Sequence, residues 1–138
     1  MRFPYHGAGI GLILDGKILM GRRSDTPFHG TWCVPGGGRD NALDSDDLST
    51  AKREMWEETA VDFSKLDASY LGEWTLKLPF FSWTTFFFSI PSFDQKLVPN
   101  EFYELQWLDP ASILDDSDKK KHFRPFTKSE VRSLLNLI

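Results

Sequence analysis

Cysteine and excess positive charge are both scarce in this chain of 138 residues. Cys33 is the only cysteine, which excludes an internal disulfide and a zinc site built from several thiolates. A reducing compartment is therefore the simplest expectation. The chain holds 16 Lys and Arg against 20 Asp and Glu, a net charge of −4. Proteins that coat nucleic acids or membrane surfaces are usually basic, so neither partner is expected.

Long apolar runs are also missing. The longest, residues 80–90, is interrupted by Ser82, Thr84, Thr85 and Ser89 and is far shorter than the ~20 residues of a membrane helix. The N-terminus, MRFPYHGAGI, lacks the charged-then-apolar pattern of a signal peptide. Hydrophobic residues still make up 41% of the chain, enough for one core. We expect a single domain over residues 1–138, located in the cytoplasm.

Hydrophobic periodicity and turn residues predict a mixed architecture. Two apolar segments, 7–14 and 17–23, flank Asp15-Gly16, the strongest short-range signal for a β-hairpin. Further strands are expected at 31–34, 68–78, 80–90 and 103–108, and helices at 44–59, 110–114 and 128–138. We predict an α/β (α+β) fold in which helices cover both faces of a mixed sheet.

The segment PGGG, residues 35–38, is predicted to interrupt regular structure. Successive glycines cost backbone entropy, so they indicate either positive φ angles or a close approach of the backbone to a ligand. The helix that follows has two candidate N-caps, Asp44 and Ser45.

Three glutamates crowd into the segment KREMWEETAV, residues 52–61. On a helix, Glu54, Glu57 and Glu58 are neighbours at the edge of the apolar stripe. Residues 44–58 contain six acidic and two basic side chains, so this segment carries a net charge equal to that of the whole chain. Such a cluster is either a solvated helix face or the site of a hard divalent cation such as Mg²⁺.

The stretch GGGRDNALDSDDLSTAKREMWEETAV, residues 36–61, resembles the signature of the Nudix hydrolase family, with the box itself at 37–61. Arg53, Glu54, Glu57 and Glu58 match its core, and the preceding residues 21–38 resemble the usual approach to it. Two features depart from the family. Gly37 and Arg53 lie 16 positions apart where the family has 14, and Ala60 replaces a glycine. Asp44 and Asp46 are the candidates to replace the family's first glutamate.

The resemblance implies an α/β/α sandwich and Mg²⁺-dependent cleavage of a phosphoanhydride, with Mn²⁺ as an alternative cofactor. It implies that Glu54, Glu57 and Glu58 bind the metal, with a backbone carbonyl from Gly37 or Gly38. Arg53 is expected to orient Glu54 or Glu57 rather than to contact the substrate. The chain also supplies candidates for the general base, which takes a proton from water. They are Glu57, Glu101 and, less favoured, Glu104.

Two arginines offer a phosphate contact. Arg22 and Arg23 are consecutive on a predicted strand, so their side chains point to opposite faces and one of them is expected to clamp a phosphate. Phe80, Phe81, Trp83 and their neighbours are expected mainly in the core, although one of them could stack on a base.

The leading hypothesis is a nucleotide pyrophosphohydrolase that acts on a nucleoside triphosphate or a related nucleoside diphosphate derivative. A nucleotide-sugar hydrolase and a non-catalytic nucleotide-binding module are the alternatives. The intact trio Glu54, Glu57 and Glu58 disfavours the non-catalytic module, because a protein that only binds nucleotides gains little from keeping three carboxylates that repel one another. A small-molecule nucleotide is the expected partner, and a homodimer is compatible with the sequence.

Overall fold

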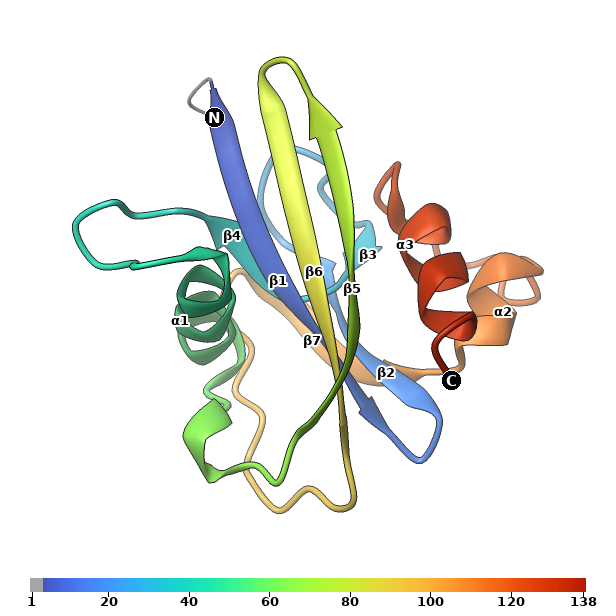
Figure 1. Cartoon of the computed structure of the whole chain (residues 1–138). Coiled ribbons are helices and arrows are strands. Elements are labelled where there is room, and N and C mark those ends of the chain that lie inside the picture. The colour runs from blue at the N-terminus through green and yellow to red at the C-terminus, as the bar shows by residue number, and fades with distance from the viewer. Residues whose placement is uncertain (1–3) are drawn as a thin grey trace.

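The computed structural model describes residues 4–138, which form a seven-stranded mixed sheet with helices on both faces (Figure 1). The strands are β1 Tyr5–Leu14, β2 Lys17–Arg23, β3 Trp32–Cys33, β4 Gly36–Gly38, β5 Ser69–Leu78, β6 Phe81–Ile90 and β7 Phe102–Leu108. The helices are α1 Asp47–Thr59, the short 3₁₀ helix η1 Phe63–Lys65, α2 Pro110–Leu114 and α3 Thr127–Leu135. The predicted fold class is confirmed.

The predicted hairpin joins β1 and β2, but the two strands pair with each other only beside the turn. Asp15 and Gly16 both have positive φ, 50° and 76°, as a tight two-residue hairpin turn requires. Beyond Ile13 and Leu14, β1 pairs instead with β4 on one side, while β2 pairs with β7. On its other side β1 runs parallel to β6 over its whole length. Because the hairpin arms take different partners, β4 enters the sheet beside the first half of β1.

Two local predictions were wrong. Residues 36–38 do not break the sheet: they form β4, whose glycines pair with Gly7, Ala8 and Gly9 of β1. Helix α1 begins at Asp47 rather than near residue 44, because its N-cap is Asp46 and not Asp44 or Ser45. Asp46 accepts a hydrogen bond from Ser49 N at 2.8 Å, and the Ser49 hydroxyl in turn accepts one from Asp46 N at 3.0 Å.

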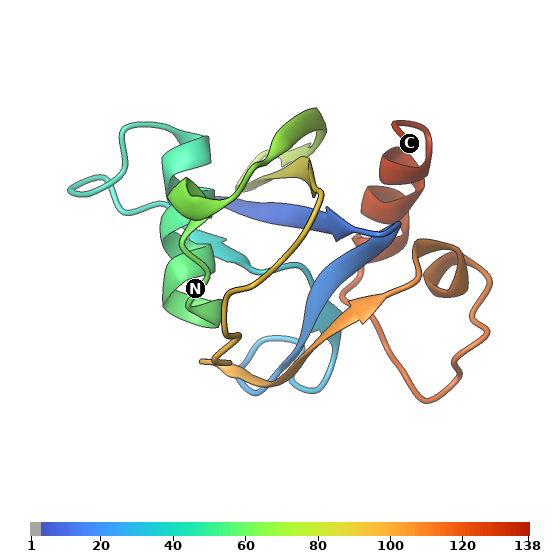
Figure 2. The ribbon, with the colours of Figure 1, turned by 90° about the horizontal axis from the view of Figure 1, so that it is seen from below.

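Figure 2 shows α1 on one side of the sheet and α2 and α3 on the other. An apolar cluster on each face holds these helices to the sheet. Ala51 and Met55 of α1 pack among the side chains of Ile10, Leu12 and Leu19. On the other face, α2 and α3 contribute Ile113, Val131 and Leu134, which pack with Ile13, Ile18 and Phe87. This arrangement is the α/β/α sandwich that the family resemblance implies. Within residues 4–138, no helix is long and apolar enough to cross a membrane.

Candidate active site

Glycines of β1 and β4 let two functional side chains lie directly on the backbone. A Cβ at Gly7 would sit 2.6 Å from Cε3 of Trp83, and one at Gly36 would sit 2.8 Å from Cη2 of the same ring. A Cβ at Gly37 would be 2.5 Å from the Glu54 carboxyl carbon. All of these distances are too short for any side chain. The close approach predicted from the glycine run is therefore made to an indole ring and a carboxylate of the chain itself.

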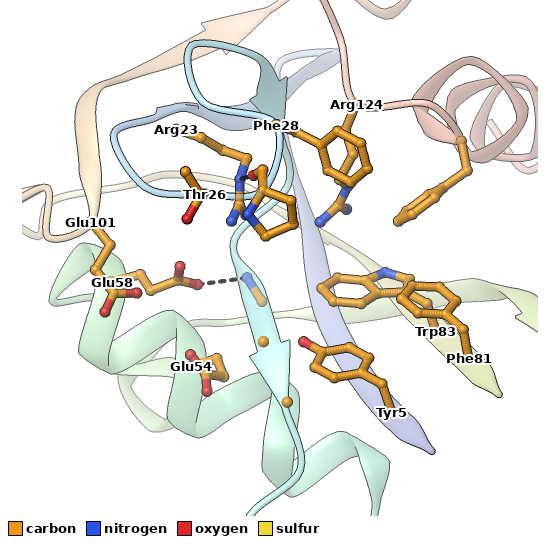
Figure 3. A pocket seen from close by; sticks show the side chains of 15 residues that line it. Tyr5, Arg23, Thr26, Phe28, Glu54, Glu58, Phe81, Trp83, Glu101 and Arg124 are labelled. Carbon is orange, nitrogen blue, oxygen red and sulfur yellow. Dashed lines mark hydrogen bonds between the residues drawn. The ribbon is translucent and has the colours of Figure 1, made fainter. Parts of the chain in front are cut away.

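Above these glycines lies a pocket of about 280 Å³ (Figure 3). Glu54, Glu58 and Glu101 line one side of it, and Figure 3 shows Tyr5, Phe81, Trp83 and Arg124 on the other. The rim is formed by Arg23 and by the loop residues Thr26, Pro27 and Phe28. The pocket thus has an acidic half and a half made of aromatic rings and arginine.

The acidic half contains two carboxylates that are costly to ionise. Glu58 is only 4% exposed, and its Oε1 accepts a hydrogen bond from Gly36 N at 2.7 Å. Burial, followed by the charges of Glu54 and Glu101, raises the pKa of Glu58 well above its usual range. Burial and the charge of Glu57 also raise the pKa of Glu54, against the opposing effect of Arg53. A cation in this half of the pocket would relieve both penalties.

Glu101 reaches the pocket because the segment before β7 is docked on the end of α1. Asn100 N donates to Glu58 O at 2.8 Å, and its side-chain amide donates to Glu57 O at 3.1 Å. Ser24 N donates to Glu101 O at 3.1 Å. Glu101 itself has a φ of 65°, a left-handed conformation that this docking holds in place. The candidate base is thus brought beside Glu54 and Glu58 despite its distance in sequence.

Arg53 lies at the centre of an ion network beside the pocket. Its Nε and Nη2 donate to the two carboxylate oxygens of Asp44, each at 2.9 Å. Its Nη1 donates to Glu57 at 3.0 Å and to Glu54 at 3.2 Å, and Nη2 also donates to the Gly38 carbonyl at 3.0 Å. Arg53 contacts Glu54 and Glu57, the residues it was expected to orient.

The unusual spacing of the box is explained by Asp44. The loop between β4 and α1 turns this side chain back onto Arg53, where it is buried and also accepts from Asp40 N and Thr50 Oγ1. The hydrogen bond from Arg53, followed by that from Asp40, holds the pKa of Asp44 far below its usual range. Of the two candidates for the missing glutamate, Asp44 therefore joins the network, while Asp46 caps the helix.

Glu57 lies outside the pocket, although the family resemblance implies that it binds the metal. Its side chain is 48% exposed, bonds to Arg53 and does not line the pocket, unlike Glu54 and Glu58. Within the described chain, no three His, Cys, Asp or Glu side chains are arranged so that they could hold a metal ion. The donor set in the pocket nevertheless suits a hard divalent cation, because Glu54, Glu58 and Glu101 offer only carboxylate oxygens there.

The two consecutive arginines are separated as their alternation predicts. Arg23 lines the pocket, and its Nε donates to Pro27 O at 2.9 Å. Arg22 lies away from it, paired with Glu104 at 3.1 Å and placed over the Tyr103 ring at 4.5 Å. Neither Arg22 nor Glu104 lines the pocket, so of the two arginines only Arg23 faces it.

Arg124 is a pocket residue that sequence reasoning missed. It falls in the charged stretch DDSDKKKHFRP, which predicts a solvated loop, yet it is only 5% exposed. Its guanidinium lies 4.4 Å from the centre of the Trp83 ring and 4.3 Å from that of Phe126. The only signal in the sequence was the arginine between two aromatic residues in FRPF.

Comparison with known proteins identifies the family. A family model described as the NUDIX domain matches residues 4–128. The chain belongs to the Nudix family. No curated protein matches the chain by sequence.

Solved Nudix structures share the fold at low sequence identity. RenU, a Nudix hydrolase from M. smegmatis, superposes with a TM-score of 0.76 at 19% identity, covering 96% of this chain and 84% of that one. A bifunctional NMN adenylyltransferase/ADP ribose pyrophosphatase from Francisella tularensis, complexed with AMP and a Mn ion, superposes with a TM-score of 0.79 at 17% identity. The match covers 96% of this chain and 41% of that one. An Ap4A hydrolase from C. elegans superposes with a TM-score of 0.71 at 15% identity, and the match covers 96% of each chain.

Proposed function

We propose that this Nudix protein is a divalent-metal-dependent hydrolase that cleaves a phosphoanhydride bond in a nucleoside triphosphate or a related nucleoside diphosphate derivative. The observation that carries the proposal is the pocket in which Glu54, Glu58 and Glu101 lie opposite an arginine and aromatic wall. The known activities of its structural relatives support the class of substrate, since they include an ADP ribose pyrophosphatase and an Ap4A hydrolase.

The acidic half of the pocket would hold the metal. Glu54 and Glu58 are its proposed ligands, with a carbonyl of Gly37 or Gly38. When bound, Mg²⁺ or Mn²⁺ supplies charge neutralisation of the phosphate oxygens and a more acidic water. Arg53 keeps Glu54 in place, and its single hydrogen bond to Glu57 supports a role for Glu57 in positioning Arg53. Gly37 and Gly38 line the same pocket, although the Gly38 carbonyl already accepts from Arg53.

The proton transfer and the stabilisation of the leaving phosphate are carried out by side chains of the protein. Glu101 takes the proton from the attacking water while the water oxygen bonds to phosphorus and the bridging P–O bond breaks. Arg23, at the rim, donates to a phosphate oxygen and stabilises the negative charge that grows on the leaving phosphate. The aromatic half receives the nucleoside.

A substrate screen tests this proposal. The protein with Mg²⁺ should hydrolyse at least one compound among nucleoside triphosphates, nucleotide sugars and dinucleotides, as detected by phosphate and pyrophosphate release. EDTA should abolish turnover, and Mg²⁺ or Mn²⁺ should restore it. Full activity in excess chelator would contradict the metal. Binding without any turnover across the panel would instead favour the non-catalytic module, and cleavage confined to nucleotide sugars would favour that alternative.

Glu101→Gln separates the base from the metal ligands. If Glu101 is the base, turnover should fall by ~10- to 100-fold with Mg²⁺ affinity little changed, and the loss should shrink at high pH, where hydroxide replaces the assisted water. A large loss of Mg²⁺ affinity would mean that Glu101 binds the metal. Glu73→Gln, on an exposed position of β5, is the matched control and should behave like the unmodified protein.

A further inference from the structure

Arg124 is a buried cation that packs against two aromatic rings. The central carbon of its guanidinium lies 4.4 Å from the centre of the Trp83 ring and 4.3 Å from that of Phe126, and the two ring centres are 6.0 Å apart. Trp83 in turn lies flat on the glycines of β1 and β4. Because the ring centres are this close, the two rings flank the guanidinium from adjacent sides and hold it in place.

The chain gives Arg124 no anionic partner. Nε and Nη2 are enclosed without a hydrogen bond, and no carboxylate in residues 4–138 forms an ion pair with it. The buried acid Glu130 accepts from the Thr85 hydroxyl instead, and its other oxygen is likewise unpartnered. Burying an unpaired charge costs several kcal/mol, roughly, and the two aromatic contacts offset only part of this cost, so the fold does not satisfy the hydrogen-bonding groups of Arg124.

The backbone fixes this side chain in the pocket wall. Arg124 N donates to Trp32 O at 3.2 Å, and Thr127 N, at the start of α3, donates to Arg124 O at 2.9 Å. The third nitrogen, Nη1, is not among the enclosed atoms, and Arg124 lines the pocket. In Figure 3 the guanidinium points inward above the Trp83 ring. A ligand in the aromatic half therefore meets a fixed hydrogen-bond donor.

The surroundings indicate what that donor receives. A phosphate in an apolar environment needs several donors at once, whereas this half of the pocket is walled by Tyr5, Phe81 and Trp83. A flat heterocycle fits aromatic walls and needs only one or two polar contacts. Arginine can only donate hydrogen bonds, so it accommodates a carbonyl oxygen and is mismatched with an amino group.

We propose that Arg124 recognises the base of the nucleotide by donating a hydrogen bond to a keto oxygen. The chain should then prefer a base with a keto group over one with an amino group at the same ring position. This inference rests on the proposed function only in taking the ligand to be a nucleotide, because it concerns binding and not cleavage.

Inosine and adenosine 5′-monophosphates form the sharpest test pair. Hypoxanthine has a keto oxygen at C6 and a hydrogen on N1, whereas adenine has an amino group at C6 and no hydrogen on N1. Neither nucleotide contains a phosphoanhydride to be cleaved. Calorimetric titration should show about tenfold tighter binding of the inosine compound, the discrimination expected of one good charged contact to a base. In Arg124→Met the two affinities should become equal. Arg124→Lys, which keeps a donor, should retain part of the preference.

Arg132→Met is the matched control, since Arg132 lies exposed on α3, and it should keep the full preference. Equal binding of both nucleotides to the unmodified protein, or a preference that survives Arg124→Met, would overturn the proposal. So would an equal loss of both ligands in Arg124→Met together with competition by inorganic phosphate, which would make Arg124 a phosphate contact. Melting curves check folding, and Arg124→Met should melt no lower than the unmodified protein because its charge has no partner.

The outcome separates this inference from the proposed hydrolysis. A clear preference for the inosine compound in a protein that cleaves nothing in the substrate screen would leave base recognition standing and remove the catalytic proposal. Metal-dependent cleavage together with equal affinities for the two nucleotides would leave the catalytic proposal standing and remove base recognition.

Discussion

Arg53 and Arg124 stand beside the same pocket and have opposite surroundings. Arg53 donates to three carboxylates and one backbone carbonyl, at 2.9 to 3.2 Å. Arg124 is more deeply buried and has two nitrogens with no partner at all. The difference separates two roles: Arg53 holds the acidic half together, while Arg124 has only Nη1 free to meet a ligand in the pocket.

The largest expected effect is at Glu58, in the half that Arg53 organises. Glu58→Gln keeps the acceptor for Gly36 N but removes the charge, so turnover should fall by roughly a thousandfold and Mg²⁺ affinity should weaken. The metal-free variant should also melt higher than the unmodified protein. The raised pKa of Glu58 means that its charge opposes folding, and this penalty grows as pH rises from about 4 through the folded-state pKa. A variant less stable than the unmodified protein at pH 8 would contradict the repulsion.

Replacing each arginine by methionine, in two separate variants, tests the comparison directly. Arg53→Met removes the partner of a buried carboxylate, so the free energy of unfolding should fall by about 3 kcal/mol, measured by denaturant titration. Arg124→Met should leave it unchanged or higher. If the two variants lose stability equally, the contrast between a supporting arginine and a ligand-binding arginine fails.

Asp44→Asn tests the same network through the pH dependence of the free energy of unfolding. The pKa of Asp44 is lowered first by Arg53, so its charge stabilises the fold fully above the unfolded-state pKa of about 4 and ceases to do so as pH falls through the lower folded-state pKa. The variant should lose about 2 kcal/mol at pH 7, and the gap should close below pH 4. A gap that is constant down to pH 2 would show that the charge is not responsible.

The smallest expected effect lies at the end of α1. Ala60 caps this helix with a φ of 61°, a left-handed conformation that suits glycine better than alanine. Ala60→Gly should therefore raise the free energy of unfolding by up to about 1 kcal/mol, without changing turnover. The carbonyls of Glu58 and Thr59, just before Ala60, accept hydrogen bonds from Asn100 N and Val98 N and so join α1 to the segment of Glu101. A change in activity would therefore show that this strain is transmitted to the site.

Sequence reasoning succeeded where a signal is local. Asp15-Gly16 specifies the hairpin, and the spacing of Glu54 and Glu58 on one helix places them together. It named Asp44 and Asp46 as candidates to replace the missing glutamate but could not decide between them, because a loop's path depends on contacts with distant residues. It also failed at residues 36–38, where the glycines pair as a strand that lets Trp83 and Glu54 approach, a condition set by tertiary packing.

The glycines beneath Trp83 also determine how this pocket can evolve. Its floor is made of main chain, so any side chain introduced at Gly7 or Gly36 would displace the indole ring instead of merely reshaping the cavity. Substitutions meant to change ligand preference without displacing this ring are then best placed in the rim loop of Thr26, Pro27 and Phe28, where Phe28 is 44% exposed. A library aimed at new substrates would be most productive in that rim loop and would lose folded members wherever it reached the glycines.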